Sequence, residues 1–392
     1  MNLNKEMKEI IQITEGLNWE EESIEIEVSE PIKSIKPAQI IEVDKYCSEL
    51  DYESVLQPDC INLIIAPTGS GKSTAFLKMA AEGSNVAVVA PFVSITNQMK
   101  INFPNMELKT GMKADDSESF AEGRITSFHS IPKMLELNNI DILVIDEWHV
   151  LASYAGYTYG MLTLFWDTLN KLKEKHPHMK IVALTGTPQF MVMADFLDYN
   201  IISIKPKHIL SKPSDIFISR SWTRELSKRD NYLYLYPSKK QGRQQANKYD
   251  GVYIDAATKD SSKAYAEILL GHMPGNRVFT STVLSTGISI TDPVDTVYTN
   301  WVDLVDIVQM SARVRQGGHI LKVTQTIPWF LRQGMDKPNL VWTGDFEKDM
   351  GLLNQYQTWY SYQAHSADEA DLFSIIYQML WLPEKELPEI YL

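Results

Sequence analysis

The sequence has little cysteine, no long hydrophobic run and no overall excess of positive charge. It contains two cysteines, Cys47 and Cys60, among 392 residues. Two cysteines are too few for a disulfide scaffold, and their scarcity indicates a reducing compartment. Neither cysteine stands at a metal-ligand spacing. No apolar run reaches the roughly 18–20 residues that a membrane-spanning helix needs. The amino-terminal stretch becomes acidic before any signal-like core, which predicts a soluble, cytoplasmic protein without a membrane partner.

The composition is that of an ordinary globular protein. Hydrophobic residues make up 44% and charged residues 22%, which excludes a largely disordered chain and a fibrous repeat. At roughly 100–200 residues per domain, the length predicts two or three domains.

The negative charge is concentrated at the two ends of the chain. The formal net charge is −13, to which residues 1–60 contribute −10 and residues 331–392 contribute −6, whereas residues 206–330 carry +5. Because salt screens distant charges, the local charge decides what a nearby anion experiences, and the total does not exclude a nucleic-acid partner. Two interpretations remain open: the acidic ends only confer solubility, or the basic middle faces a polyanion.

Two series of short apolar segments alternate with helix-like segments. The first series comprises Ile61–Ile65, Val86–Ala90, Arg124–Phe128, Asp141–Asp146 and Ile181–Thr185. The second comprises Asn231–Tyr236, Gly251–Asp255, Arg277–Thr282, Asp295–Asn300 and His319–Gln325. Such β-branched runs are typical of strands buried on both faces, and their alternation with helices predicts a parallel sheet for each series. The predicted fold class is therefore α/β, with two domains in tandem joined near Ile201–Ser214.

The two ends of the chain differ from this pattern. Residues 1–55 are predicted to form an acidic extension with a helix at Lys5–Ile13 and an edge strand at residues 23–28. Residues 331–392 are rich in aromatic residues and predict one or two helices ended by Pro383. The rings of this tail either stack on bases or pack against the rest of the chain, and helical spacing amid acidic residues favours packing. The predicted domains are thus 1–55, 56–205, 206–330 and 331–392.

A phosphate-binding loop lies directly between the first apolar run and a predicted helix. Ala66 stands where such loops usually have their first glycine, and the loop continues with Pro67, Thr68, Gly69, Ser70, Gly71, Lys72, Ser73 and Thr74. The glycines let backbone N–H groups turn toward phosphate oxygens, and the following helix adds its positive end. Lys72 is expected to reach the β- and γ-phosphates of ATP, and the Ser73 hydroxyl is expected to ligate Mg²⁺.

Two adjacent carboxylates follow the fourth apolar run, in the sequence Asp146-Glu147-Trp148-His149. Parallel α/β sheets bind their ligands at the carboxyl ends of the strands. We therefore expect Asp146 to hold Mg²⁺ through water and Glu147 to orient and polarise the attacking water.

Together, the phosphate-binding loop and the Asp-Glu-Trp-His sequence resemble motifs I and II of superfamily 2 DExH-box helicases. Over residues 61–330, further segments resemble the family's other motifs in their usual order: Ala90–Gln98 (motif Ia), Thr126–Ser130 (the next strand-end motif), Leu184–Pro188 (III), Leu235–Lys240 (IV), Ser281–Ile288 (V) and Gln309–Arg315 (VI). The resemblance implies two RecA-like domains with ATP and Mg²⁺ in the cleft between them.

The resemblance also implies roles for individual residues. Gln309, Arg313 and Arg315 would act on the nucleotide from the start of a helix. Arg313 would lie on the face of Gln309 and contact the γ-phosphate as the arginine finger, whereas Arg315 would lie on a flank. Gly287 would join the cofactor-binding residues, and the residues that couple ATP to strand binding would be His149, Thr185 and Thr187. The nucleic-acid contacts would be Pro91, Phe92, Thr126, Phe128, Ser238, Ser281 and Thr286.

Motif VI departs from the usual family pattern, because Gln316 stands where a second arginine is usual. The Gln-x-x-x-Arg-Val-Arg form is similar to that of viral origin-binding helicases. This similarity favours DNA over RNA, and a replication or recombination protein of a phage or mobile element, acting in a bacterial or phage-infected cytoplasm. Replication or defence proteins are the further partners that it suggests. A glutamine motif that would read adenine is missing before the loop.

The predicted activity is that of an ATP-dependent helicase or single-strand translocase. Two alternatives remain open. One is a double-strand translocase or remodelling ATPase that does not unwind, and the other is a nucleotide-gated binding subunit of a larger replication or defence assembly.

Overall fold

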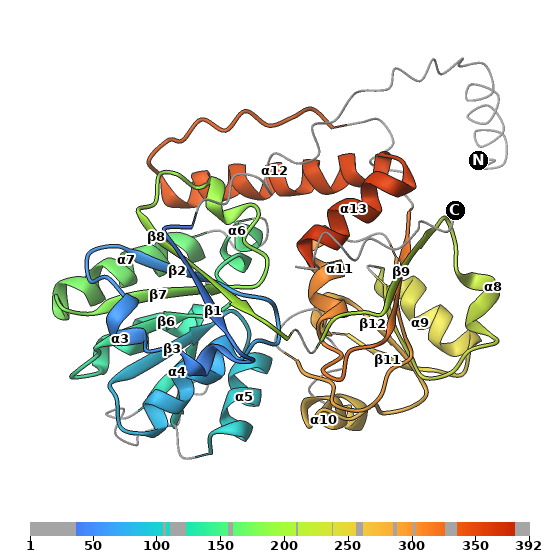
Figure 1. Cartoon of the computed structure of the whole chain (residues 1–392), viewed down its shortest axis with the longest axis horizontal. Coiled ribbons are helices and arrows are strands. Elements are labelled where there is room, and N and C mark those ends of the chain that lie inside the picture. Colours follow the sequence, from blue (N-terminus) through green and yellow to red (C-terminus); the bar gives the residue numbers. More distant parts are fainter. Residues whose placement is uncertain are drawn as a thin grey trace, which may run out of the picture.

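Two parallel β-sheets flanked by helices form the body of the molecule (Figure 1). The computed structural model describes residues 37–104, 107–109, 123–155, 160–208, 211–236, 238–255, 262–284, 288–300, 303–325 and 335–380. The helix and the edge strand predicted before residue 37, and the helix end predicted at Pro383, lie outside these residues. The predicted class of two tandem α/β domains followed by a helical tail is confirmed.

The first sheet has the strand order β1-β8-β2-β7-β6-β3-β5-β4 within the described ranges. Its strands are β1 (Gln39–Val43), β2 (Ile61–Ile65), β3 (Val86–Ala90), β4 (Glu107–Lys109), β5 (Gly123–Ser127), β6 (Ile142–Ile145), β7 (Lys180–Thr185) and β8 (Tyr199–Pro206). All neighbouring strands run parallel. Strand β2 lies between β7 and β8, so the loop that follows it opens well inside the sheet.

The second sheet has the order β11-β12-β10-β13-β14-β9 and is also parallel. Its strands are β9 (Asp215–Ser219), β10 (Tyr232–Leu235), β11 (Val252–Ile254), β12 (Arg277–Thr280), β13 (Thr296–Thr299) and β14 (Ile320–Thr324).

Helices cover both sheets. Those of the first domain are η1 (Cys47–Glu49), α3 (Tyr52–Val55), α4 (Lys72–Ala81), α5 (Val93–Asn102), η3 (Phe128–Glu136), α6 (Val150–Tyr154), α7 (Met161–Lys175) and η4 (Met191–Met193). Those of the second domain are α8 (Thr223–Leu226), α9 (Lys239–Lys248), α10 (Lys263–Leu269), η5 (Thr282–Leu284) and α11 (Leu304–Ser311). Alternate residues of β2 enter different cores, Leu63 and Ile65 on one face and Ile64 on the other, as a doubly covered sheet requires.

Two carboxy-terminal helices, α12 (Phe346–Ser366) and α13 (Glu369–Met379), complete the described chain. Helix α12 runs along one side of both domains, and α13 turns back beside α11 (Figure 1). The rings of Tyr356, Tyr360, Phe373 and Tyr377 are buried, which confirms that this tail packs against the rest of the molecule.

The structure extends the first domain at both ends of its sequence. Strand β1 pairs with β8 as the sheet's edge strand, so the described residues 39–55 belong to the first domain and not to a separate extension. Strand β8 continues to Pro206, inside the segment predicted as the joint. None of the helices in the described ranges combines the length and the apolarity that a bilayer crossing requires.

Candidate nucleotide-binding site

The phosphate-binding loop lies between β2 and α4, and its backbone depends on glycine at two positions. Gly69 and Gly71 have φ values of 88° and 80°, in the left-handed region that side chains with a Cβ rarely adopt. Gly71 is also the N-cap residue, directly before α4. This conformation aims the amino-terminal end of α4 at the cleft between the domains, where the helix favours an anion.

Lys72 lies at the centre of the loop with its charge directed inward. Its Nζ donates hydrogen bonds to the carbonyl oxygens of Ala66 (2.8 Å) and Pro67 (3.0 Å). Burial lowers the pKa of this ammonium group, and the nearby carboxylates of Glu147 and Asp146 oppose that effect. Lys72 therefore stands between the loop and the carboxylates that follow β6.

Asp146 and Ser73 lie side by side on the first-domain wall of the cleft and offer two oxygen ligands to a cation. Burial raises the pKa of Asp146 to about 7, together with the negative charge of Glu147, whereas a hydrogen bond with Ser73 lowers it. A carboxylate and a hydroxyl suit Mg²⁺, which usually takes one or two protein ligands and completes its shell with water and phosphate oxygens. No group of three or more His, Cys, Asp or Glu side chains in the described part of the chain could hold a metal without such additional ligands.

Glu147 has an unusual backbone and a strongly charged environment. Its φ is 50°, which turns its side chain away from that of Asp146. Burial raises the pKa of the Glu147 carboxyl, but the nearby His149, Arg313 and Lys72 together lower it by more. The pKa is therefore below its usual value. Because burial also lowers the pKa of His149 to about 4, this ring is neutral at pH 7. Arg313 and Lys72 therefore supply the positive charge that keeps Glu147 ionised.

A chain of polar contacts links the second domain to the carboxylates of the first. His149 Nδ1 lies 3.1 Å from Thr185 Oγ1, which accepts a hydrogen bond from the backbone N–H of Thr187 (3.1 Å). Gln309 Nε2 donates to Thr187 Oγ1 (3.4 Å). Arg313 completes the connection, because its Nη2 donates both to Gln309 Oε1 and to Glu147 Oε1, the latter at 3.5 Å. The residues predicted to couple ATP to strand binding thus form one network with Gln309 of the second domain.

Arg315 reaches the cleft separately from Arg313. Its Nε donates to Ser289 Oγ (2.8 Å), whereas its buried Nη1 has no hydrogen-bond partner among the described residues. A Cβ added to Gly69 would lie 2.5 Å from this Nη1, so the guanidinium group directly faces the phosphate-binding loop. Burial lowers its pKa to about 10, and it stays charged at pH 7.

The predicted placement of these arginines on a helix is wrong. Helix α11 ends at Ser311, so Gln309 lies near its carboxyl end, and Arg313 and Arg315 follow it. The chain then runs beside Ile290, since the N–H of Arg315 donates to Ile290 O (2.9 Å) and Val314 forms a parallel bridge to Ile290. Turns and the single bridge at Val314 replace the regular helix after Ser311, and both arginines line the cleft.

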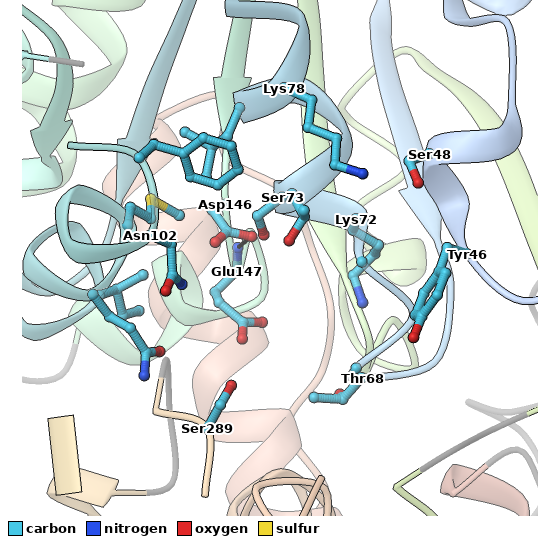
Figure 2. Close-up of a pocket in the computed structure, with 18 of the residues that line it drawn as sticks. Tyr46, Ser48, Thr68, Lys72, Ser73, Lys78, Asn102, Asp146, Glu147 and Ser289 are labelled. Carbon is cyan, nitrogen blue, oxygen red and sulfur yellow. Dashed lines mark hydrogen bonds between the residues drawn. The ribbon is translucent and has the colours of Figure 1, made fainter. Parts of the chain in front are cut away.

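The site opens into a cavity of about 340 Å³ between the two domains. Figure 2 shows Asp146, Glu147 and Ser73 at its centre, with Lys72, Thr68 and Tyr46 along one wall. Its lining also includes residues to which the motifs assign no role: Tyr46, Ser48, Gln98, Met99, Asn102 and Ser289. Two of them had a local signal, since Gln98 ends the motif Ia segment and Ser289 lies two residues after the Gly287 of motif V.

Tyr46 is held at this cavity by contacts between its neighbour and the loop. The Cys47 N–H donates to Ser70 O (2.9 Å), and Cys47 Sγ lies 3.2 Å from Ser70 Oγ. The Tyr46 ring lies near Gly71, 3.6 Å from the position that a Cβ would take there. An aromatic face is thus placed beside the phosphate-binding loop.

The side chains proposed to touch nucleic acid are mostly buried, which corrects several expectations. Thr126 is fully buried, and the Phe128 ring packs against Tyr154 and Phe165 in the core of the first domain. Two more are also inaccessible, Pro91 and Ser281, whereas Phe92 and Ser238 are half-buried. Apolar side chains at these strand ends pack inward because both faces of the sheet are covered. His129, within the same motif segment as Thr126 and Phe128, is exposed and accessible to solvent. Thr286 and Gly287 lie outside the described residues.

Comparisons with known proteins agree with this arrangement. The sequence profile of the family "Type III restriction enzyme, res subunit" matches residues 32–190, a range that includes the loop and both carboxylates. No curated protein matches the sequence.

Solved structures of proteins bound to nucleic acid match most of the chain at low sequence identity. S. cerevisiae Dbp5 bound to RNA and ADP BeF3 has a TM-score of 0.51 and 13% identity, covering 90% of this chain and 96% of that one. A single-substitution variant of Dbp5, with the same ligands, has a TM-score of 0.52 and the same identity and coverage. The DUF1998 helicase MrfA bound to DNA has a TM-score of 0.48 and 12% identity, covering 68% of this chain and 46% of that one. This chain therefore spans less than half the length of MrfA. The likeness to Dbp5 shows the fold alone, that of two RecA-like parallel-sheet domains in tandem.

Proposed function

We propose that the protein is an ATP-dependent nucleic-acid helicase or single-strand translocase. One observation carries the proposal: the phosphate-binding loop and carboxylates of the first domain share a single cavity with Arg313 and Arg315 of the second domain. A site divided between two domains is suited to convert nucleotide hydrolysis into domain movement, because its two halves must approach for catalysis.

The residues of the cavity supply the groups that phosphoryl transfer requires. The backbone of the loop and Lys72 would bind the phosphates, and Ser73 and Asp146 would hold Mg²⁺, which neutralises the developing charge when it is bound. Glu147 would orient and polarise the attacking water. Arg315, which faces the loop, would contact the γ-phosphate. Arg313 would fix the positions of Glu147 and Gln309 relative to each other through its hydrogen bonds to both.

Nucleic acid is the proposed partner, with DNA favoured over RNA. The exposed cations of the second domain support this proposal: Arg220, Arg224, Lys228, Lys239 and Lys240. Contacts from such side chains to the phosphate backbone bind nucleic acid without recognising its base sequence. The form of motif VI supports a role in replication or recombination of a phage or mobile element, with replication or defence proteins as further partners.

Two variants test the nucleotide site. Lys72→Ala should lose ATP turnover, because the β- and γ-phosphates lose their cation. Glu147→Gln should bind ATP but stall hydrolysis, because an amide cannot polarise water in the same way. Steady-state turnover and nucleotide binding, measured on both variants and the wild type, decide the matter. Wild-type turnover in Glu147→Gln would refute the proposed mechanism.

A nucleic-acid panel separates the proposed function from its alternatives. Turnover stimulated by single strands, with displacement of a duplex strand, supports the helicase. Stimulation by duplex without displacement favours a double-strand translocase. Turnover that no DNA or RNA stimulates favours a nucleotide-gated subunit of a larger assembly.

A further inference from the structure

Helix α12 is anchored on the first domain at its amino-terminal end. The rings of Phe346 and Trp166 stack at 4.2 Å. Glu347 accepts hydrogen bonds from the Gly160 N–H (2.6 Å) and from Thr163 Oγ1 (2.5 Å), one on each carboxylate oxygen. Both partners lie at the start of α7, so this end of α12 is fixed by an aromatic stack and two polar contacts.

The same helix contacts the second domain about four turns later. Ser361 Oγ accepts a hydrogen bond from the Leu304 N–H (3.3 Å) and donates one to Asp303 Oδ1 (3.1 Å). Asp303 Oδ1 in turn accepts from the Val305 N–H (3.1 Å). These contacts satisfy backbone donors at the amino-terminal end of α11, which no residue of α11 itself can do. Ser361 is almost fully buried, with 1% exposure, so this capping interaction is internal.

The contacts of α12 lie next to three segments of the nucleotide site. Helix α6, against which α12 packs, begins at Val150, directly after His149. The Tyr360 ring packs edge-on against Phe190 at 5.6 Å, shortly after Thr187. Helix α11 carries Gln309 and leads into Arg313 and Arg315. One helix therefore touches the chain beside each half of the site.

We infer that α12 is a positioning element for catalysis, and that Ser361 is its positioning residue. The inference rests on the proposed function. Anchored on the first domain by Glu347, α12 sets the amino-terminal end of α11 through Ser361, and thereby sets where Gln309 and the two arginines meet the first domain. Because misplacement by about 1 Å can cost about a hundredfold in rate, this linkage affects turnover without touching the nucleotide.

The test compares single variants at the two ends of α12 with a matched control. Ser361→Ala and Glu347→Ala should each lower kcat for nucleic-acid-stimulated ATP hydrolysis by about tenfold. The KM for ATP should stay within about twofold, because the phosphate-binding loop is unchanged. Asp303→Asn, which keeps an acceptor oxygen for Val305 and Ser361, should retain kcat. Gln355→Ala, at an exposed position of the same helix, is the control and should behave as the wild type.

The double variant separates a shared linkage from two local defects. If both ends act through one helix, Ser361→Ala with Glu347→Ala should lose about as much kcat as the worse single variant. Additive losses would overturn the inference, as would kcat values equal to that of Gln355→Ala or losses explained by the unfolded fraction in a thermal melt. If the wild type itself does not hydrolyse ATP, the proposed function fails instead.

Discussion

The protonation of Asp146 makes nucleotide binding depend on pH. Its pKa is raised to about 7, and only the ionised carboxyl ligates Mg²⁺, so protons compete with the metal below this pH. From pH 8 to pH 6 the ionised fraction falls from about nine-tenths to about one-tenth. We expect the Kd of a magnesium–nucleotide complex, measured by calorimetry, to rise about tenfold over this range. Asp146→Asn should bind weakly with a shallower dependence on pH, and equal wild-type affinity at both pH values would contradict the prediction.

The two arginines of the second domain should differ when each is replaced. Arg315 faces the loop with an unpartnered Nη1, so Arg315→Ala should lose about 10³-fold or more in kcat, as arginine fingers do, with little change in stability. Arg313→Ala breaks contacts to Glu147 and Gln309, so it should lose turnover and also lower the melting temperature. The helical placement predicted from the sequence instead makes Arg313, which would share a face with Gln309, the contact to the γ-phosphate. Turnover and melting curves of both variants decide the ranking, and a larger loss of turnover for Arg313→Ala with unchanged stability restores the order from the sequence.

Tyr46 is expected to bind the base of the nucleotide. Its ring is 38% exposed, lies beside the loop and lines the cavity, and base–aromatic stacking contributes about 1–3 kcal/mol. Tyr46→Ala should therefore raise the KM for ATP about tenfold while kcat changes little. Tyr46→Phe keeps the ring and is the matched control. A KM equal to that of the wild type in Tyr46→Ala would place the base elsewhere.

Among the larger elements, the carboxy-terminal helices should be needed for solubility. These helices and the segment before them cover Trp166, Phe190 and Phe196 through ring contacts from Phe346, Tyr360 and Trp342. A fragment of residues 1–330 would expose these rings and should aggregate, as size-exclusion chromatography and light scattering would show. If the fragment stays monomeric and melts cooperatively, the tail is not part of the core.

Most of the strands that sequence patterns identified are buried on both faces, although the edge strand β11 was identified with only Ile254 buried. The runs INLII and VAVVA, for example, form strands β2 and β3, in which every residue is buried. The missed strands have mixed patterns because their environments are mixed: β1 and β9 are edge strands with exposed positions, and β8 contains Asn200, whose side chain donates to Asn62 in the interior. Periodicity reports burial, so it fails where a strand is half exposed or where buried polar groups pair with one another.

At the scale of the whole molecule, charge distribution should govern the response to salt. Each phosphate that a Lys or Arg neutralises releases a counterion, so stimulation of the ATPase by DNA should fall steeply as salt rises. Replacing Lys239 and Lys240 by Gln should make this dependence shallower. Lys171→Gln, an exposed change in the first domain, should leave it unchanged. Equal salt slopes in all three proteins would exclude α9 from the binding surface.

The site was predictable where its chemistry lies in one segment and not where it is assembled from distant ones. Lys72, Asp146 and Glu147 follow strands within recognisable motifs, and they share the cavity as expected. Tyr46 and Ser289 lie outside these motifs, one in each domain, and meet at the cavity only through packing between the domains. The buried state of Thr126 and Phe128 also depends on tertiary packing, which a motif does not describe.

The position of β2 in its sheet sets the order in which the protein can acquire its phosphate-binding loop during synthesis. Ile61 pairs on one side with Ile181 and on the other with Tyr199, so neither neighbour exists when the loop leaves the ribosome. At about 5–20 residues per second, the strand INLII would wait roughly 6–28 s for its partners. During that interval an apolar strand with two unpaired edges is open to misassociation. Nucleotide therefore cannot assist the earliest folding of this domain, and a chaperone can.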